Sequence, residues 1–314
     1  MTLREPVRDA LRAAGLDPGE VERLARAAIA EDLRCGPDLT TAAIIPAGTA
    51  AAADVVARGA GVVAGLPVAA AVIDAAGDVL GAGDAVLGAA GAGRVEALAA
   101  DGDRVAPGDV VARVTGPLRV ILGAERTLLN FLTHLSGIAT ATRAWVDAVA
   151  GTGCQVRDTR KTLPGLRALQ KYAVRCGGGV NHRMGLGDAA LVKDNHVAAA
   201  GGIAAAFRAV RAAAPGVPAE VECDTLDQVG EALAAGATLI LLDNMGLDDL
   251  RSAVRLARAY PGVRLEASGG LRLADARAVA ATGVHYLAVG ALTHSSPALD
   301  LGLDIAAARR DPGR

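Results

Sequence analysis

The chain has 314 residues, of which 52% are hydrophobic and 21% are charged, and its formal net charge is −2. This composition is typical of a folded protein and excludes an intrinsically disordered chain. Aromatic residues make up only 2%, and the overall charge is slightly acidic, so a nucleic-acid-binding surface of stacked rings and basic side chains is also excluded.

No segment predicts a membrane span or a secretion signal. The longest uncharged apolar run, residues 59–73, is interrupted by Gly61, Gly65 and Pro67 and is too short to cross a bilayer. The N-terminal residues MTLREPVRDALRAAG are charged and contain no apolar signal core. Four cysteines without CxxC spacing indicate neither a disulfide framework nor a zinc site. We therefore expect a cytoplasmic protein that binds neither membranes nor nucleic acid.

The first half of the chain predicts a small α/β domain. Residues 1–30 carry apolar positions at helical spacing, with one break, and predict two short helices. Residues 50–116 consist of short Val/Ala runs separated by Gly and Asp, which is a pattern of β-hairpins. A lipoyl or biotinyl carrier is excluded here, because no lysine precedes Lys161. A long helix is predicted at about residues 125–149.

The second half predicts repeated βα units. Six apolar runs each end in a polar or small residue and precede a helical segment: CQVRDTR, AALVKDNH, AEVECDT, LILLDNM, VRLEASGG and HYLAVGAL. Six repeated βα units predict a parallel sheet that is closed, or nearly closed, into a barrel. We expect an N-terminal α/β sandwich domain at residues 1–135 and an incomplete TIM-like α/β barrel, with fewer than eight βα units, at residues 136–294. The C-terminal tail, about residues 295–314, is expected to pack on the first domain.

All three lysines of the chain, against 29 arginines, lie in one basic segment, residues 157–196. This segment holds eight Arg and Lys against three Asp, a net charge of +5, so the remainder of the chain carries −7. A basic island in an acidic chain indicates a site for a small anion. Within it, residues 166–175 predict a solvated arginine-rich helix. Lys171 is expected in an ion pair or on the helix surface, where Lys171→Arg is nearly silent.

The carboxyl ends of barrel strands form one face, so residues far apart in the sequence are expected to converge there. That face would combine cationic side chains, carboxylates and backbone amides at glycine turns, supplied by Arg160, Lys161, His182, Arg183, Lys193, Glu222, Asp243, Ser268, Gly269, Gly270 and Gly290. Glycine turns that open onto helix N-termini bind phosphate, and crowded cations require an anion. This chemistry fits phosphoribosyl transfer. It also fits an aldolase with Lys161 or Lys193 as Schiff-base nucleophile, or a non-catalytic phosphate-ligand sensor.

Several long motifs carry a family resemblance: DTRKTLPGLRALQKYAV, GGGVNHRMGLGDAALVKDNH, LILLDNM, LEASGG, VGALTHS and, earlier in the chain, ERTLLNFLTHLSGIAT. They resemble the motifs of quinolinate phosphoribosyltransferases over nearly the whole chain. The resemblance implies that phosphoribosyl pyrophosphate and quinolinate give nicotinate mononucleotide, pyrophosphate and CO2, with magnesium, in de novo NAD biosynthesis. A related transferase on the same fold, which acts on another pyridine acid or is associated with molybdenum transport, is the close alternative.

The resemblance also implies which residues bind quinolinate. Its two carboxylates would be held by Arg160, His182, Arg183 and Lys193. Arg126 would join them from the partner subunit of a homodimer. Four residues that flank these positions are expected to support the site without touching substrate: Asn181, Asp194, Asn195 and His196.

On the phosphoribosyl side, the resemblance implies that Lys161, Glu222 and Asp243 are catalytic, with Lys161 drawing charge from the leaving pyrophosphate. Glu222 and Asp243 would also bind Mg²⁺, directly or through substrate or water. The 5′-phosphate would be surrounded by Ser268, Gly269, Gly270, Gly290, Ala291 and His294, and Thr159 would complete the substrate-binding set. Two further histidines are set aside, His134 as a packed residue and His285 as a residue of open role.

Overall fold

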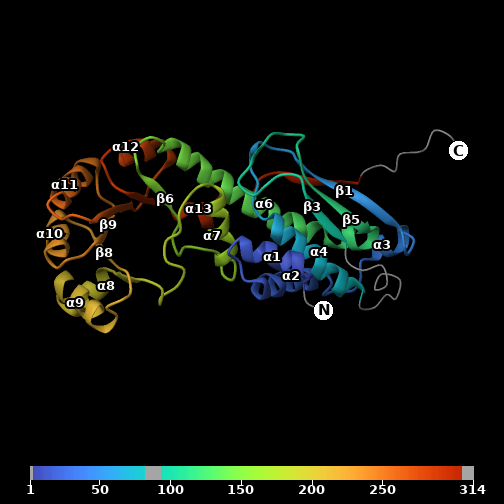
Figure 1. Cartoon of the computed structure of the whole chain (residues 1–314), viewed down its shortest axis with the longest axis horizontal. Coiled ribbons are helices and arrows are strands. Elements are labelled where there is room, and N and C mark those ends of the chain that lie inside the picture. The colour runs from blue at the N-terminus through green and yellow to red at the C-terminus, as the bar shows by residue number, and fades with distance from the viewer. Residues whose placement is uncertain (1–2, 82–92, 306–314) are drawn as a thin grey trace. The chain divides into compact units, whose positions relative to one another are not determined.

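The computed structural model describes residues 3–81 and 93–305 (Figure 1). The chain divides into two compact units, and the long helix α6, Leu118–Ala148, contributes to both. The first unit consists of residues 1–140, 168–176 and 296–314, and the second of residues 141–167 and 177–295. Among the described residues, every helix is too short or too polar to cross a membrane.

The first unit contains a four-stranded antiparallel sheet in the order β12-β1-β5-β3. Its strands are β1 (Ala50–Ala57), β3 (Arg94–Ala97), β5 (Val110–Pro117) and β12 (Leu301–Ile305), and the short strands β2 (Gly61–Val62) and β4 (Arg104–Val105) pair with each other. β12 comes from the far end of the chain and places Leu303 opposite Val55 of β1. The alternating burial along β1 and β5 turns one face of the sheet toward helices.

The helices of the first unit supply the other layer of this α/β sandwich. They are α1 (Glu5–Ala13), α2 (Pro18–Asp32), α3 (Leu39–Ile44), α4 (Leu66–Gly81), the first part of α6, and most of α7 (Arg167–Cys176). The start of α2 is set by Asp17, whose carboxylate accepts the Glu20 N–H at 2.7 Å, and by Pro18 in the first turn. Ile29, Val55 and Leu128 lie in one apolar core that joins α2, the sheet and α6.

Helix α4 corrects the sequence analysis, which predicted only hairpins between residues 50 and 116. Gly65, at φ +107°, turns the chain into this helix, and Pro67 occupies its first turn. The Asp101 carboxylate accepts the N–H groups of Gly65 and Leu66 at 2.9 and 3.1 Å. The helix is therefore capped by a residue more than thirty positions away, which local patterns do not reveal.

The second unit is built around six parallel strands in the order β6-β11-β10-β9-β8-β7. They are β6 (Gln155–Arg157), β7 (Ala190–Val192), β8 (Ala219–Cys223), β9 (Leu239–Asp243), β10 (Arg264–Ser268) and β11 (Tyr286–Ala288). β6 and β7 do not pair with each other, although Val180 forms an isolated parallel bridge to Arg157. This is the incomplete α/β barrel that the sequence predicted.

Helices lie outside these strands, as Figure 1 shows for α9 to α12. They are α8 (Asp194–Ala200), α9 (Ile203–Ala213), α10 (Leu226–Ala234), α11 (Leu247–Ala257), a 3-10 turn (Leu273–Asp275), α12 (Ala276–Ala280) and α13 (Ala291–His294). The N-terminus of α10 is a capping box, in which Thr225 accepts the Gln228 N–H and the Gln228 side chain accepts the Thr225 N–H. Such short turns between strand and helix keep the strand ends in place.

Helix α7 contradicts the expectation of a solvated helix. Lys171 is 0% exposed, and its neighbours are buried as well. The Gln170 amide donates to Nε2 of His134 at 2.9 Å, and the Tyr172 hydroxyl donates to Asp101. These contacts of Gln170 and Tyr172 fix α7 within the first unit. Lys171 is therefore a buried residue of that unit, and the expectation of a position on the helix surface was wrong.

Exchange of this buried lysine has a measurable cost. We expect Lys171→Arg to lower the free energy of unfolding by about 1–3 kcal/mol, because a larger planar group must fit a filled space. Urea denaturation followed by circular dichroism measures it. Arg208→Lys, on an exposed position of α9, is the control and should change stability by less than about 0.5 kcal/mol. Equal stability of both variants would contradict the burial of Lys171.

Candidate active site

The parallel register of the barrel brings the expected site residues to one edge. Asp243 and Ser268 end β9 and β10 and lie directly opposite each other. Glu222 lies opposite Leu241, near the end of β8, and Lys193 follows the last residue of β7. Because all these strands run in the same direction, their carboxyl ends meet at one face of the second unit.

A hollow of about 380 Å³, which we call the cation hollow, opens at this face. It is lined by Thr159, Arg160, Lys161, His182, Arg183, Leu191, Lys193, Glu222, Leu241, Asp243, Glu266, Ser268 and Ala288. Nine of the residues expected to bind substrate thus lie around one space. The apolar side chains of Leu191 and Leu241 leave room for an uncharged ring between the charged groups.

The positive charges in this hollow are only partly compensated. The pKa of Arg183 is lowered, first by burial and then by the neighbouring charge of Arg160. Nε of Arg160 is buried and has no hydrogen-bond partner in the described structure. A buried guanidinium N–H without an acceptor is costly, and two like charges repel. Both costs disappear when an anion binds between Arg160 and Arg183.

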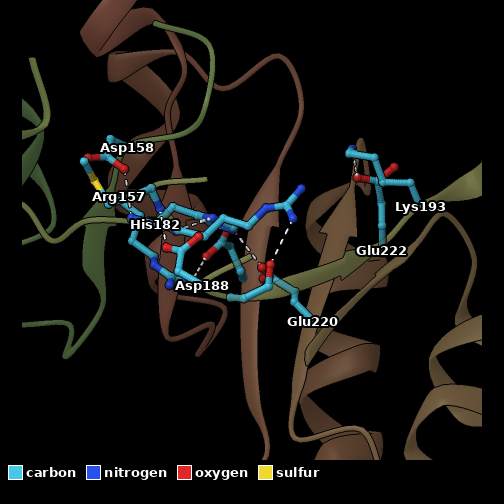
Figure 2. A network of polar contacts seen from close by, with 11 residues as sticks. Arg157, Asp158, His182, Asp188, Lys193, Glu220 and Glu222 are labelled. Atoms are coloured by element: carbon cyan, nitrogen blue, oxygen red, sulfur yellow. Dashed lines mark hydrogen bonds and ion pairs between the residues drawn. The ribbon is translucent and has the colours of Figure 1, made fainter. Parts of the chain in front are cut away.

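The carboxylates on the opposite side are each held by one neighbour. Nζ of Lys193 lies 2.5 Å from Oε2 of Glu222, and this ion pair is visible in Figure 2. Asp243 accepts a hydrogen bond from the Asn244 amide at 2.6 Å. Lys193, expected at a quinolinate carboxylate, therefore contacts the carboxylate expected on the phosphoribosyl side. The ion pair connects the two halves of the hollow.

A second hollow of about 190 Å³, the glycine hollow, adjoins the first one. It is lined by Thr159, Lys161, Ser268, Gly269, Gly270, Leu271, Ala288, Val289, Gly290, Ala291 and His294, and shares Lys161 with the cation hollow. The lining includes Gly269, Gly270 and Gly290, which follow β10 and β11, and glycine turns at strand ends suit a phosphate. The expected phosphate-binding residues thus lie together, with Lys161 between them and the cations.

Lys161 is fixed through its backbone, which leaves its side chain free to act in both hollows. Its N–H donates to Oγ1 of Thr159 at 3.0 Å, and its carbonyl accepts from Oγ1 of Thr293 at 2.8 Å. A Cβ on Gly290 would approach Cδ of Lys161 to 3.0 Å. Glycine at this position therefore gives the lysine stem its space.

Sequence reasoning missed a buried polar group at the wall of the cation hollow. Glu220 and Glu266 are 3% and 0% exposed, and they lie beside His182 and Arg157. The available signal was a charged residue inside each of two apolar strand runs, Glu220 and Glu266. Side chains alternate along a strand, so Glu220 points to the same side of its strand as the expected site residue Glu222. His182, Glu220 and Glu266 have the types and spacing of metal ligands. The guanidinium of Arg157 on Glu266 argues against a cation there.

The remaining expected residues lie outside the two hollows. Arg126 is exposed on α6 in the first unit, and His134 is half-buried there, with burial lowering its pKa. Nδ1 of His285 accepts the Leu265 N–H at 3.0 Å, which is a structural contact. The flanking residues stabilise loops: Asn181 donates to Asp158, and His196 accepts the Lys193 N–H at the start of α8.

A larger hollow, of about 560 Å³, lies in the first unit and has different chemistry. Its walls are mostly apolar residues of α1, α4 and β3, with Arg4 and Arg94 as the charged members. Arg4 is already paired with Asp74 and donates to the carbonyl of Gly93. This hollow offers no combination of cations, carboxylates and glycine turns.

The fold and the two hollows define a barrel protein whose strand ends carry cations, carboxylates and glycine turns, a combination that suits a small phosphate-bearing anion. The model of the N-terminal domain of quinolinate phosphoribosyl transferase matches residues 38–136, and that of the C-terminal domain matches residues 138–304. The nicotinate-nucleotide pyrophosphorylase [carboxylating] of Mycobacterium leprae is 55% identical over 282 residues, which cover 89% of this chain and 95% of the relative. Together the two domain models match most of the chain.

Solved structures agree with these matches. The crystal structure of NadC from Streptococcus pyogenes is similar with a TM-score of 0.82 and 38% identity, over 93% of this chain and 99% of that one. The nicotinate-nucleotide pyrophosphorylase of Francisella tularensis has a TM-score of 0.81 and 37% identity, over 92% and 96% of the two chains. This chain belongs to the quinolinate phosphoribosyl transferase family.

The turn after β10 generates a prediction about the site. Gly269 has φ +88°, and a Cβ there would lie 2.2 Å from Oδ1 and 2.8 Å from the backbone N of Asn244. Asn244 itself has φ 54° and holds Asp243. We expect Gly269→Ala to lower the free energy of unfolding by about 1–3 kcal/mol and to weaken binding of inorganic pyrophosphate, measured by calorimetry. Gly187→Ala, whose Cβ meets nothing within 4 Å, should change neither.

Proposed function

We propose that this protein transfers phosphoribosyl from phosphoribosyl pyrophosphate to quinolinate with decarboxylation, and so forms nicotinate mononucleotide for NAD biosynthesis. The observation that carries this proposal is the pair of adjoining hollows that share Lys161. One is suited to a dicarboxylate and the other to a sugar phosphate. The family and the names of its relatives agree with this reaction.

Quinolinate fits the cation hollow by charge. Its two carboxylates would neutralise Arg160, Arg183 and Lys193, and the buried Nε of Arg160 would gain an acceptor. Each charge-assisted hydrogen bond contributes roughly 1.5–3 kcal/mol, so these cations both bind and orient the pyridine ring. Nicotinate, with a single carboxylate, would leave part of this charge uncompensated. We therefore expect selectivity for the dicarboxylate.

Phosphoribosyl pyrophosphate would place its 5′-phosphate in the glycine hollow and its diphosphate toward Lys161. Glu222 and Asp243 then face the ribose. The ring nitrogen forms a bond to C1′ of ribose as the C1′–oxygen bond breaks, and pyrophosphate leaves with the electron pair. Lys161 stabilises the charge that develops on pyrophosphate, and the carboxylates stabilise the positive charge on ribose.

Decarboxylation follows from the charge of the new pyridinium. CO2 leaves from the carbon beside the ring nitrogen, the electron pair stays on that carbon, and a proton from water replaces the carboxylate. The pyridinium stabilises this carbanion without a dedicated protein acid. The protein contributes position and electrostatics.

Magnesium is proposed as the cofactor on the basis of the carboxylates. Glu222 and Asp243 each have one carboxylate oxygen engaged by a neighbour, Lys193 and Asn244, and a second oxygen without a hydrogen-bond partner among the described residues. Carboxylate and phosphate oxygens with several waters are the ligands that Mg²⁺ prefers. These residues fit the ion, and when bound it would neutralise charge on the diphosphate.

A homodimer is proposed in which Arg126 of one subunit completes the cation hollow of the other. Two observations support it. Arg126 is exposed, and it lines neither hollow of its own chain. A closed two-fold dimer would supply two such arginines, one to each site. The family resemblance assigns Arg126 this role.

The reaction and the role of Lys161 are tested together. Wild-type protein with quinolinate, phosphoribosyl pyrophosphate and Mg²⁺ should form nicotinate mononucleotide, detected by chromatography. Lys161→Arg keeps the charge but loses the compact ammonium, so kcat should fall about 10²-fold. Arg208→Lys is the control and should retain activity. Absence of product, or equal turnover of nicotinate, would contradict the assignment, and full activity of Lys161→Arg would contradict the role of Lys161.

The shared site is tested by mixed dimers. Arg126→Ala and Lys161→Ala, carried on differently tagged chains, are co-expressed, and the mixed dimer is isolated through both tags. If Arg126 acts across the interface, one site collects both changes and the other is intact, so about half of the wild-type activity returns. Each variant alone should be nearly inactive. An inactive mixed dimer would place Arg126 in the site of its own chain.

A further inference from the structure

His182 is held by hydrogen bonds at both ring nitrogens. Nδ1 accepts the backbone N–H of Arg183 at 2.8 Å. Nε2 lies 2.7 Å from Oε2 of Glu220. A nitrogen that accepts a hydrogen bond carries no proton, so with Nδ1 as acceptor the ring would carry its proton on Nε2, which would donate to Glu220. Both nitrogens are therefore engaged within the protein although the ring lines the cation hollow.

Two buried carboxylates and one guanidinium lie beside the His182 ring. Glu266 pairs with Arg157, and its Oε1 lies 3.7 Å from Nε2 of His182. Burial, together with the charge of Glu220, raises the pKa of Glu266 to about 7. The guanidinium of Arg157 thus compensates Glu266, and Glu220 is the carboxylate that the His182 ring contacts.

A chain of contacts leads from this group to a substrate-binding cation. Asp158, which is 0% exposed, accepts the backbone N–H of His182 at 2.8 Å. The His182 ring then holds the backbone of Arg183, and Nη1 of Arg183 donates to the carbonyl of Ala189 at 3.0 Å. Figure 2 shows His182 between Asp158 and Glu220 in this network. Arg183 is thus held at two points, its backbone N–H and its guanidinium.

We infer that His182 is a positioning residue, whose neutral ring, fixed by the buried Glu220 and Glu266, holds Arg183 in place for a carboxylate of the substrate. This inference differs from the expected role of His182 as a direct carboxylate ligand. Arg160, Arg183 and Lys193 meet the substrate, and His182 acts through Arg183. The identity of the substrate rests on the proposed function. The hydrogen bonds of the His182 ring are independent of it.

Nitrogen NMR of the full-length protein tests the state of the ring directly. Histidine labelled with ¹⁵N reports which ring nitrogens carry protons, and the His182 signals are assigned by their loss in His182→Asn. We expect one proton, on Nε2, both without ligand and with saturating quinolinate. A doubly protonated ring in the quinolinate complex, or a proton on Nδ1, would overturn the inference. A protein that fails to turn over quinolinate still gives the ligand-free result, so failure of the two proposals is distinguishable.

Two substitutions separate positioning from direct binding. His182→Ala removes the acceptor for the Arg183 N–H, and the KM for quinolinate should rise about tenfold. Oδ1 of asparagine lies near the position of Nδ1, so His182→Asn should recover most of that loss. The KM for phosphoribosyl pyrophosphate should change in neither variant. Equal losses in the two variants, with circular dichroism showing both folded, would mean that the ring itself binds substrate.

Discussion

The site depends on one constraint, the parallel hydrogen bonding of six short strands. That pairing aligns Asp243 with Ser268 and brings Glu222 beside them, so that residues from separate βα units face one space. A shift by one residue along a strand would turn each of these side chains to the other face. The apolar strand residues around them, such as Val221 and Ile240, are fully buried and stabilise this register.

Within that frame, charge determines what the site accepts. Arg160 and Arg183 lie close enough for one to lower the pKa of the other, while Glu222 and Asp243 stand across the hollow. Such an arrangement stores an electrostatic cost that a dianion relieves. Glu266 is buried at the wall of this hollow and pairs with Arg157, and Glu220 is buried and contacts His182. The acidic residues thus divide into those that face the ligand and those that support the residues binding it.

Local sequence patterns predicted a large part of this organisation. The run LILLDNM is apolar and ends in Asp, and it became β9 with Asp243 at its last position. The same reasoning failed for α4, because its cap is Asp101, and for Lys171, because charge and helical spacing say nothing about which face becomes buried. The expected role of His182 came from the family resemblance. The partners of its ring, Glu220 and the Arg183 backbone, come from different segments.

The sequence by itself determined the αβ alternation, the barrel class, the basic segment and the glycine turns, because strand, helix and turn signals are local. The tertiary structure decided which of these residues share a space. It placed Lys171 in the core of the first unit and Lys161 between the two hollows. It also joined Lys193 to Glu222, and the His182 ring to Glu220 and to the backbone of Arg183. These features depend on long-range pairing and burial, which arise only when the chain is folded.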